Sequence, residues 1–238
     1  MDKNKLKQWA LFAPVIGSSL FFILTIIAMF TFAGGYMFEP TSPGYSLINN
    51  FFSDLGMITG YSGDSNMVSS TLFLMATLFC GLLMMPYFAV IPSIFKSNRI
   101  NYILIILGST LGFIAAIGYI GIGFTPWDKS EASLSAHMFF VYLAFPLTLP
   151  VVICYVTAFL QKKDFPRILS YIYIIMGVIL VVYLYLLFFG PSAGTEIGRI
   201  IQVVGQKVIV YAEILTFWIQ GYYTSKYFKN KEKIKALV

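Results

Sequence analysis

The amino-acid sequence predicts an all-α polytopic membrane protein with six transmembrane helices, on the strength of three observations. The chain of 238 residues is 58% hydrophobic and 11% charged, with a mean hydropathy of +0.81, whereas a soluble domain carries about 25% charged residues. Six apolar runs each reach the roughly 20 residues that a helix needs to cross a bilayer. No run alternates with a period of two, and backbone groups in lipid must bond within their own segment, so each run is predicted to be a helix.

The six predicted spans are joined by short connections on one side of the membrane and by longer ones on the other. They cover residues 9–32, 68–95, 100–124, 136–160, 168–190 and 199–223. Residues 1–238 are therefore expected to form a single transmembrane domain. The first span follows a basic start, but its apolar run exceeds the 7–15 residues of a secretory signal core, so we interpret it as a retained anchor.

Basic residues are distributed unevenly between the two sides of this predicted bundle. Thirteen of the 16 lysines and arginines lie in the N-terminal segment, in two tight connections and in the tail at residues 224–238, all on one side. By the positive-inside rule, both termini are predicted to be cytoplasmic in a multi-pass protein of the cell membrane. The basic tail is expected to contact anionic lipid and not nucleic acid.

The long connection at residues 33–67 is predicted to lie on the outer side and to cap the mouth of the bundle. It opens with GGYMFEPTSPGYS, whose glycines and prolines oppose one continuous helix. The following NNFFSDLGMITG has paired aromatic residues and no helix breaker before Gly56, which favours a short helix along the membrane surface. A loop of about 35 residues with its own aromatic side chains typically folds down as a lid or a plug.

Small residues recur along the third span, at Gly108, Gly112, Gly118, Gly121 and Gly123. Such spacing lets two helix backbones approach closely. Both a thin helix beside a cavity and ordinary tight packing are compatible with this pattern.

The sixth span carries a polar stripe along one face. At 100° per residue, its main members fall within an arc of about 60°. They are Arg199, Gln202, Gln206, Glu213 and Gln220, and Glu196 and Lys207 flank them. Such a face is costly against lipid, so it is predicted to point into the bundle. It could line a cavity or form a network satisfied by its own members, and the sequence leaves both open.

Depth separates the ionisable members of this stripe. Arg199 is expected at the outer interface, where it reaches water or binds an anionic headgroup. Lys207 lies about 12 Å further in, and there it needs a carboxylate, carbonyl groups or a ligand. Glu213 is deeper still, and it either needs partners on other helices or is held protonated. We therefore expect Lys207, Glu213 and Gln220 to belong to a buried polar network.

Asp54 and His137 are the candidates for chemistry in the outer half, as a pair that handles a proton. The structural alternatives are that Asp54 shapes the turn at Gly56 and that His137 is a hydrogen-bonded cap. A serine triad is disfavoured, because the side chains of Ser53 and Asp54 diverge by about 100° on a helix. One histidine and two cysteines inside spans offer no metal site, and no cofactor is expected.

Three features together carry a family resemblance: Asn-x-x-Ser-Asp-Leu-Gly at residues 50–56, Gly-x-Gly-Phe-Thr-Pro at residues 121–126, and the lone His137. This order resembles the archaeal and bacterial domain-of-unknown-function family 998. It is similar, more distantly, to the eukaryotic Frag/DRAM/Sfk membrane proteins; the relatives often have Ile-Ser-Asp where this chain has Phe-Ser-Asp. The resemblance implies a six-helix fold with an outward-facing polar loop site, and the eukaryotic relatives are linked to lipid handling and membrane organisation.

These observations predict an outward-facing polar pocket that binds a lipid headgroup or a small amphiphile, with membrane lipids as partners. The expected ligand-binding residues are Asn50, Ser53, Asp54, Asp128, His137, Glu196, Arg199, Gln202, Gln206 and Lys207. No assembled catalytic centre is evident, and an enzymatic activity would be that of a membrane-embedded lipid-modifying hydrolase. Two alternatives stay open: a structural or accessory subunit that pairs with other membrane subunits or with itself, and a transporter of a small solute or ion.

Overall fold

The computed structural model describes residues 2–235, which form six long helices and two short 3₁₀ helices. The long helices are α1 (Lys3–Phe30), α2 (Met67–Val90), α3 (Arg99–Phe124), α4 (Glu131–Gln161), α5 (Arg167–Phe189) and α6 (Glu196–Lys235), and the short ones are η1 (Phe52–Gly56) and η2 (Ile91–Ile94). Six helices are long and apolar enough to cross a membrane, and the described residues hold no strand beyond isolated bridges. The prediction of an all-α protein with six candidate spans is confirmed.

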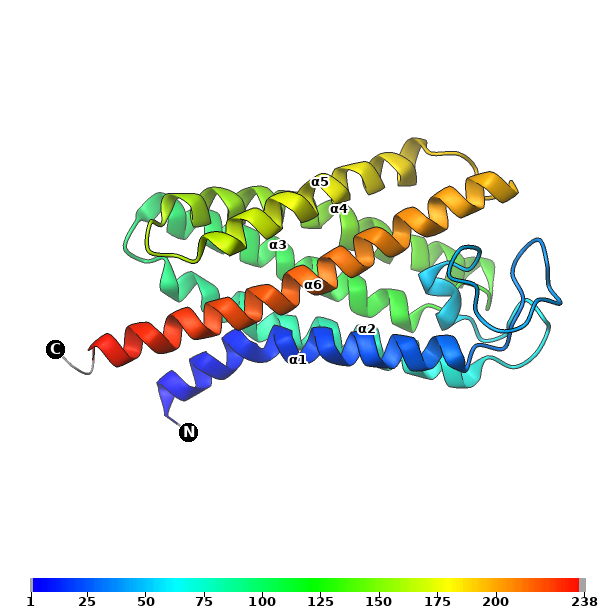
Figure 1. Cartoon of the computed structure of the whole chain (residues 1–238), viewed down its shortest axis with the longest axis horizontal. Coiled ribbons are helices and arrows are strands. Elements are labelled where there is room, and N and C mark those ends of the chain that lie inside the picture. The colour runs from blue at the N-terminus through cyan, green and yellow to red at the C-terminus, as the bar shows by residue number, and fades with distance from the viewer. Residues whose placement is uncertain (1, 236–238) are drawn as a thin grey trace.

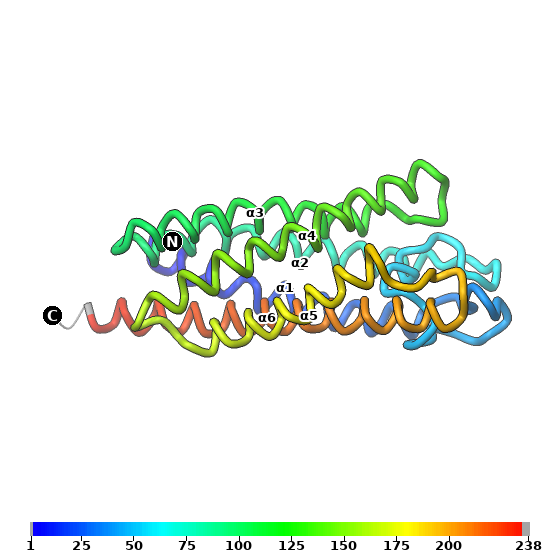
Figure 2. The backbone as a smooth tube through the Cα atoms, turned by 90° about the horizontal axis from the view of Figure 1, so that it is seen from above, coloured from blue at the N-terminus to red at the C-terminus, as the bar shows by residue number. Residues whose placement is uncertain are grey.

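The helices form an elongated bundle in which each helix packs against the next in chain order (Figures 1 and 2). The last helix, α6, returns to pack against α1, so the six helices make a closed ring. Because six crossings are an even number, the start of α1 and the end of α6 lie at the same end of the bundle (Figure 1). Side chains from all six helices meet in the middle of this ring.

Side-chain caps determine where two of the central helices begin. The carboxamide oxygen of Asn98 accepts hydrogen bonds from the backbone N–H groups of Ile100 and Asn101, at 2.9 and 3.1 Å, and so starts α3. The hydroxyl of Ser130 accepts from Ser133 N at 3.1 Å and starts α4. These bonds satisfy N–H groups that have no partner within a helix. α4 therefore begins at Glu131, five residues before the expected start at residue 136.

The last helix continues beyond its expected end. The tail predicted at residues 224–238 is helical as far as Lys235, and residues 236–238 lie outside the described residues. The stretch KYFKNKEKIK contains no glycine or proline, and lysine and glutamate are good helix formers, so nothing stops the helix at the expected membrane surface.

Asp164, in the α4–α5 connection, holds this extension of α6 in place. Its carboxylate lies 2.6 Å from the ammonium of Lys231 and accepts a hydrogen bond of 2.7 Å from the hydroxyl of Tyr227. Lys162 forms a further ion pair with it at 3.1 Å. The hydrogen bond from Lys231 is the main cause that lowers the pKa of Asp164 below its usual value. The basic end of α6 thus has a docking partner inside the chain.

The long first connection, residues 31–66, is folded against the end of the bundle opposite to the termini (Figure 1). The short helix expected in NNFFSDLG is present as the 3₁₀ helix η1, which packs against α1, α2, α3 and α6. The chain turns sharply at Gly35, whose φ of 77° favours glycine. A Cβ atom there would also lie 2.5 Å from the carbonyl oxygen of Pro40.

Asn66, at the N-terminus of α2, ties the two ends of this connection together. Its carboxamide oxygen accepts from Ala33 N at 3.0 Å, and its nitrogen donates to the carbonyl oxygens of Leu55 and Met57 at 3.3 and 2.9 Å. The side chain is buried, so each of its bonds replaces one with water. A single asparagine therefore fixes the loop where it leaves α1 and where it enters α2.

The glycines of α3 allow close helix packing and also border the centre of the bundle. A Cβ atom at Gly118 would lie 2.9 Å from the backbone nitrogen of Ala144 in α4. Gly112, one turn and a half earlier, lines the central cavity described below. Both interpretations of the glycine pattern therefore apply, each to a different part of the helix.

We predict that Gly118→Ala lowers the free energy of unfolding by up to about 2 kcal/mol. Overpacking costs about 1–3 kcal/mol, and the higher helix propensity of alanine over glycine returns about 1 kcal/mol of it. Gly205→Ala in α6 is the matched control, because a Cβ atom there meets the movable end of the Leu186 side chain at 2.8 Å and otherwise the Tyr183 ring at an ordinary 4.0 Å. Unfolding in mixed micelles titrated with a denaturing detergent measures both, and equal stability of the two variants would contradict the close α3–α4 contact.

Candidate functional site

A buried ion pair joins the first loop to the last helix. Nη2 of Arg199 lies 3.1 Å from Oδ2 of Asp54, and their side chains are 5% and 0% exposed. The same guanidinium donates through Nε to the carbonyl oxygen of Asn49 at 2.7 Å and through Nη2 to the hydroxyl of Tyr61 at 2.8 Å. It also lies over the ring of Phe51, 4.9 Å from its centroid. The expectation that the side chain of Arg199 reaches water is wrong, because the folded loop covers it and uses its donors.

Asn50 and Lys207 form a second set of contacts between the loop and α6. The carboxamide of Asn50 accepts from Ser46 N at 2.9 Å and donates to Gly35 O at 3.0 Å. The ammonium of Lys207 donates to the backbone oxygen of Asn50, and it lies 5.2 Å from the ring centroid of Tyr45. Of the partners predicted for Lys207, a carboxylate, carbonyl groups or a ligand, the structure shows a carbonyl group. Its positive charge, like that of Arg199, is directed at the loop.

Asp54 is the centre of this polar cluster. Besides Arg199, its Oδ2 accepts from Phe51 N at 2.9 Å and from the carboxamide of Asn50 at 3.3 Å. Burial raises the pKa of Asp54 from its usual value of 3.8 to about 6, against the opposing effects of the Arg199 guanidinium and the Phe51 N–H. The carboxyl group is therefore charged at pH 7 and takes up a proton in mild acid.

The underside of η1 forms a roof over the middle of the bundle. Phe52 N donates to Oε1 of Gln206 at 2.6 Å, which holds η1 to α6. The ring of Phe52 packs on Phe21 of α1 and on Tyr211 of α6, with centroids 5.7 and 5.5 Å apart. Ser53, next to it, borders the space below.

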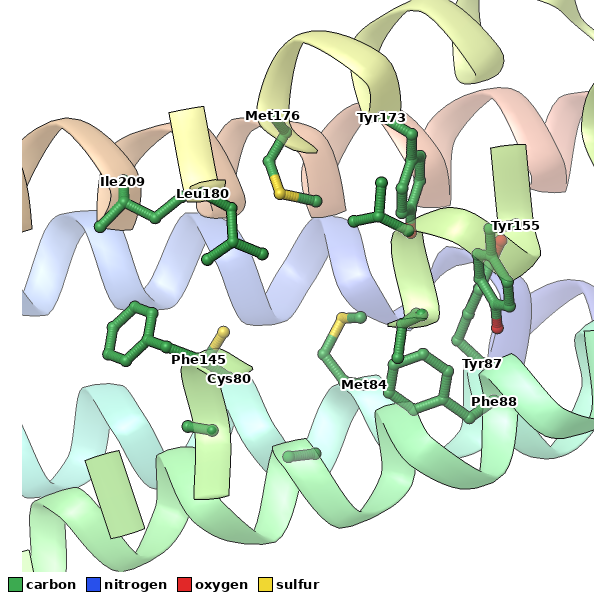
Figure 3. Packing of buried hydrophobic residues seen from close by; sticks show 14 of the residues in the cluster. Cys80, Met84, Tyr87, Phe88, Phe145, Tyr155, Tyr173, Met176, Leu180 and Ile209 are labelled. Atoms are coloured by element: carbon green, nitrogen blue, oxygen red, sulfur yellow. The ribbon is translucent and has the colours of Figure 1, made fainter. Parts of the chain in front are cut away.

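A cavity lies beneath this roof, in the centre of the helix ring. The space open to the centres of water molecules is about 80 Å³, several times the roughly 10–15 Å³ that one water needs. Most lining side chains are apolar or aromatic, and Cys80, Met84 and Phe145 point into the middle of the bundle together with Met176 and Leu180 (Figure 3). The polar lining residues are Ser53, Thr77, Tyr119, His137, Thr148, Gln206 and Glu213.

Glu213 is the acidic residue of this lining. It is 3% exposed, and both of its carboxylate oxygens accept from the hydroxyl of Tyr119, at 2.9 and 2.8 Å. Tyr119 lies in α3, and its hydroxyl is also 3.2 Å from that of Thr148 in α4. The expected need of Glu213 for a partner on another helix is confirmed.

The structure does not bring Asp54 and His137 together. Nδ1 of His137 lies 2.8 Å from the carbonyl oxygen of Thr125, the residue that caps the end of α3, so the histidine is a hydrogen-bonded cap of the neighbouring helix. His137 borders the cavity, whereas Asp54 is enclosed by Arg199 and the loop and does not line it. The hypothesis of an Asp–His pair that handles a proton is therefore not supported by the geometry.

Other residues expected to bind a ligand are engaged with the backbone. Asp128 accepts from Ile58 N and Thr59 N at 2.9–3.0 Å, so it positions the loop. Gln202 donates to Leu186 O at 2.7 Å and steadies the α5–α6 connection. Glu196 is exposed in the first turn of α6.

The expected network of Lys207, Glu213 and Gln220 is not continuous. Lys207 bonds the loop and Glu213 bonds Tyr119, while neither amide atom of the buried Gln220 has a hydrogen-bond partner. Among residues 2–235 no group of three or more His, Cys, Asp or Glu side chains could hold a metal ion. Sequence reasoning did not single out Tyr119, whose hydroxyl is the visible partner of Glu213.

Comparison with protein-family models, with curated proteins and with solved structures finds no match. The resemblance to family 998 and to the Frag/DRAM/Sfk proteins therefore stays a prediction, and the function has to be argued from the site itself.

We predict that Arg199→Met lowers the free energy of unfolding by about 3–5 kcal/mol, because it leaves the buried Asp54 carboxylate without its partner. Asp54→Asn should cost less, because it removes a charge that burial disfavours. The double variant should cost less than the sum of the two, since it leaves no unpaired charge. The same detergent titration measures this cycle, with the exposed Lys129→Met as a control that changes little. Additive costs would show that the pair is not coupled.

We also predict a defined pH dependence for Asp54. Because its pKa is about 6 in the folded protein and near 3.8 when unfolded, the folded state binds more protons between those pH values. The free energy of unfolding therefore rises as pH falls through this window, by up to about 3 kcal/mol from this group. Stability of the wild type minus that of Asp54→Asn, measured from pH 7 to pH 4, should change in this direction; a constant difference would contradict it.

Proposed function

We propose that this protein binds an amphiphilic molecule of the membrane in the central cavity, beneath the roof formed by η1. The observation that carries the proposal is the cavity itself: an apolar, aromatic space in the middle of a helix ring, with a few polar groups directed into it. Pockets of this composition are the usual sites of small-molecule binding, in which apolar walls supply affinity and a few polar groups fix orientation.

The polar groups first expected to hold a headgroup have a different role in this proposal. Asn50, Asp54, Arg199 and Lys207 bond to one another or to the loop backbone. A ligand would have to displace these bonds and would leave buried charges without partners, at a cost of several kcal/mol. These residues therefore hold the roof in place.

The groups left for the polar part of a ligand lie at two levels. Ser53, His137 and Gln206 border the upper part of the cavity, near η1, and Glu213 borders it deeper in the bundle. Between them the walls are made by side chains such as Phe73 and Val141. This distribution suits a molecule with an apolar body and a small polar group.

Binding is proposed here, and not catalysis, on the geometry of the cavity-lining groups. In the part of the chain that the structure describes, no hydrogen bond joins a lining serine, threonine or cysteine to His137, whose Nδ1 already contacts Thr125 O. A nucleophile needs such a base beside it.

We predict that Ala115→Phe displaces the bound molecule by filling the cavity. Ala115 lines the cavity and is 3% exposed, so a phenyl ring there occupies the space of the ligand. Native mass spectrometry of the purified protein should detect a co-purified amphiphile on the wild type and at least tenfold less of it on this variant.

Ile114→Phe is the matched control for that experiment. Ile114 precedes Ala115 on α3 but is 37% exposed on the outer face of the bundle, so the same ring there does not enter the cavity. Retention of the amphiphile by Ala115→Phe, or its absence from the wild type, would overturn the proposal. Thermal unfolding of both variants shows that they are folded.

A further inference from the structure

We infer that the molecule bound in this cavity carries a positively charged nitrogen, an ammonium group that pairs with Glu213. This inference rests on the proposed function and adds the chemical class of the ligand. It comes from the distribution of buried charge, from the aromatic composition of the cavity wall and from the donors that Glu213 lacks.

The buried cations of the bundle are already engaged. Arg199 is paired with Asp54, and Lys207 donates to the backbone oxygen of Asn50. Six residues of helix separate Lys207 from Glu213, a rise of about 9 Å. The ammonium of Lys207 is directed away from Glu213, toward the loop and the ring of Tyr45.

Glu213, in contrast, has no cation of its own. The ion pairs that the structure shows have Asp54 and Asp164 as their acids, and none of them includes Glu213. The one hydroxyl of Tyr119 serves both oxygens of Glu213, although a carboxylate offers about four acceptor positions. A glutamate without a cation beside it is costly to ionise at this depth, and such residues in membrane helices mark functional sites.

The walls around Glu213 suit an ammonium group. The aromatic lining residues are Phe21, Phe52, Phe73, Phe88, Tyr119, Phe145, Tyr173 and Phe217. The face of an aromatic ring attracts a cation by about 2 kcal/mol or more when water is excluded, and cages of such rings are used to bind quaternary ammonium groups. A carboxylate among aromatic rings thus attracts an alkylammonium ion, and repels the anionic headgroup that an exposed Arg199 would have favoured.

Three probes with the same alkyl chain separate charge from hydrophobicity. They are dodecyltrimethylammonium, 1-dodecanol and dodecanoate, each added below its micelle concentration to the purified protein in a non-ionic detergent. The stabilisation of the native state against heat reports the affinity of each. We expect the ammonium to bind at least tenfold more tightly than the alcohol, and dodecanoate to bind most weakly.

Variants then identify the carboxylate that causes the preference for the ammonium probe over dodecanol. Glu213→Gln should remove the tenfold preference while the affinity for dodecanol changes less than twofold. Glu196→Gln removes a carboxylate from the same helix, but at an exposed position that does not line the cavity, and should keep the preference. Tyr119→Phe removes the hydroxyl that donates to Glu213 and should increase the preference for ammonium. This variant provides the test if Glu213→Gln does not fold.

The outcomes distinguish this inference from the proposed function. Equal affinity of the wild type for the ammonium and the alcohol, with both abolished by Ala115→Phe, would overturn the ammonium inference and leave the cavity as a binding site. Binding of both probes that Ala115→Phe does not affect would overturn both. Loss of the preference in Glu196→Gln as well would show that overall charge, and not Glu213, selects the ligand.

Discussion

The shape of the end of the bundle opposite to the termini depends on the buried ion pair between Asp54 and Arg199. Its partners are 145 residues apart in the chain, and the cavity has a roof only when they meet. Two charges that leave water lose most of what their attraction provides, so such a pair adds little net stability. Its geometry is demanding, however, because one planar guanidinium also bonds Asn49 O and the hydroxyl of Tyr61. The main effect of the pair is therefore to position the loop: it holds η1 and Phe52 in one register on α6.

The polar stripe of α6 consists of two parts with different tasks. Its upper residues, Arg199, Gln206 and Lys207, bond the loop. Backbone oxygens of the loop accept hydrogen bonds from Arg199 and Lys207. They replace the water that would accept these bonds at an open surface, because lipid supplies no acceptors. Glu213, below them, faces the cavity and contacts Tyr119. The loop thus provides partners for Arg199 and Lys207, and Glu213, further along the helix, is left without a cation.

Hydropathy was sufficient to predict six helices, because bilayer thickness and backbone hydrogen bonding admit few other solutions. The inward direction of the α6 stripe also followed from the period of the helix. The partners of its residues did not follow, since they depend on how a loop without a repeating pattern folds. Arg199 was expected at the interface because nothing in its spacing shows that η1 covers it. Tyr119 went unnoticed for a similar reason: its meeting with Glu213 depends on the rotation of α3 in the ring, which an almost uniformly apolar helix does not reveal.

Asn66 has a consequence for the order in which the chain can be assembled. Its bonds to Ala33, Leu55 and Met57 all lie within the stretch that joins α1 to α2, so the loop closes on itself through residues that leave the ribosome early. Arg199 belongs to the last helix, and until that helix enters the ring Asp54 has no counter-charge. The α1–α2 hairpin can therefore fold its loop before α6 is made. When α6 packs against α1, Arg199 supplies the counter-charge of Asp54 and the ring around the cavity closes. Synthesis that stops before α6 would leave an open bundle in which the carboxylate of Asp54, buried in the complete fold, is exposed. Such an exposed carboxylate would distinguish the incomplete protein from the complete one.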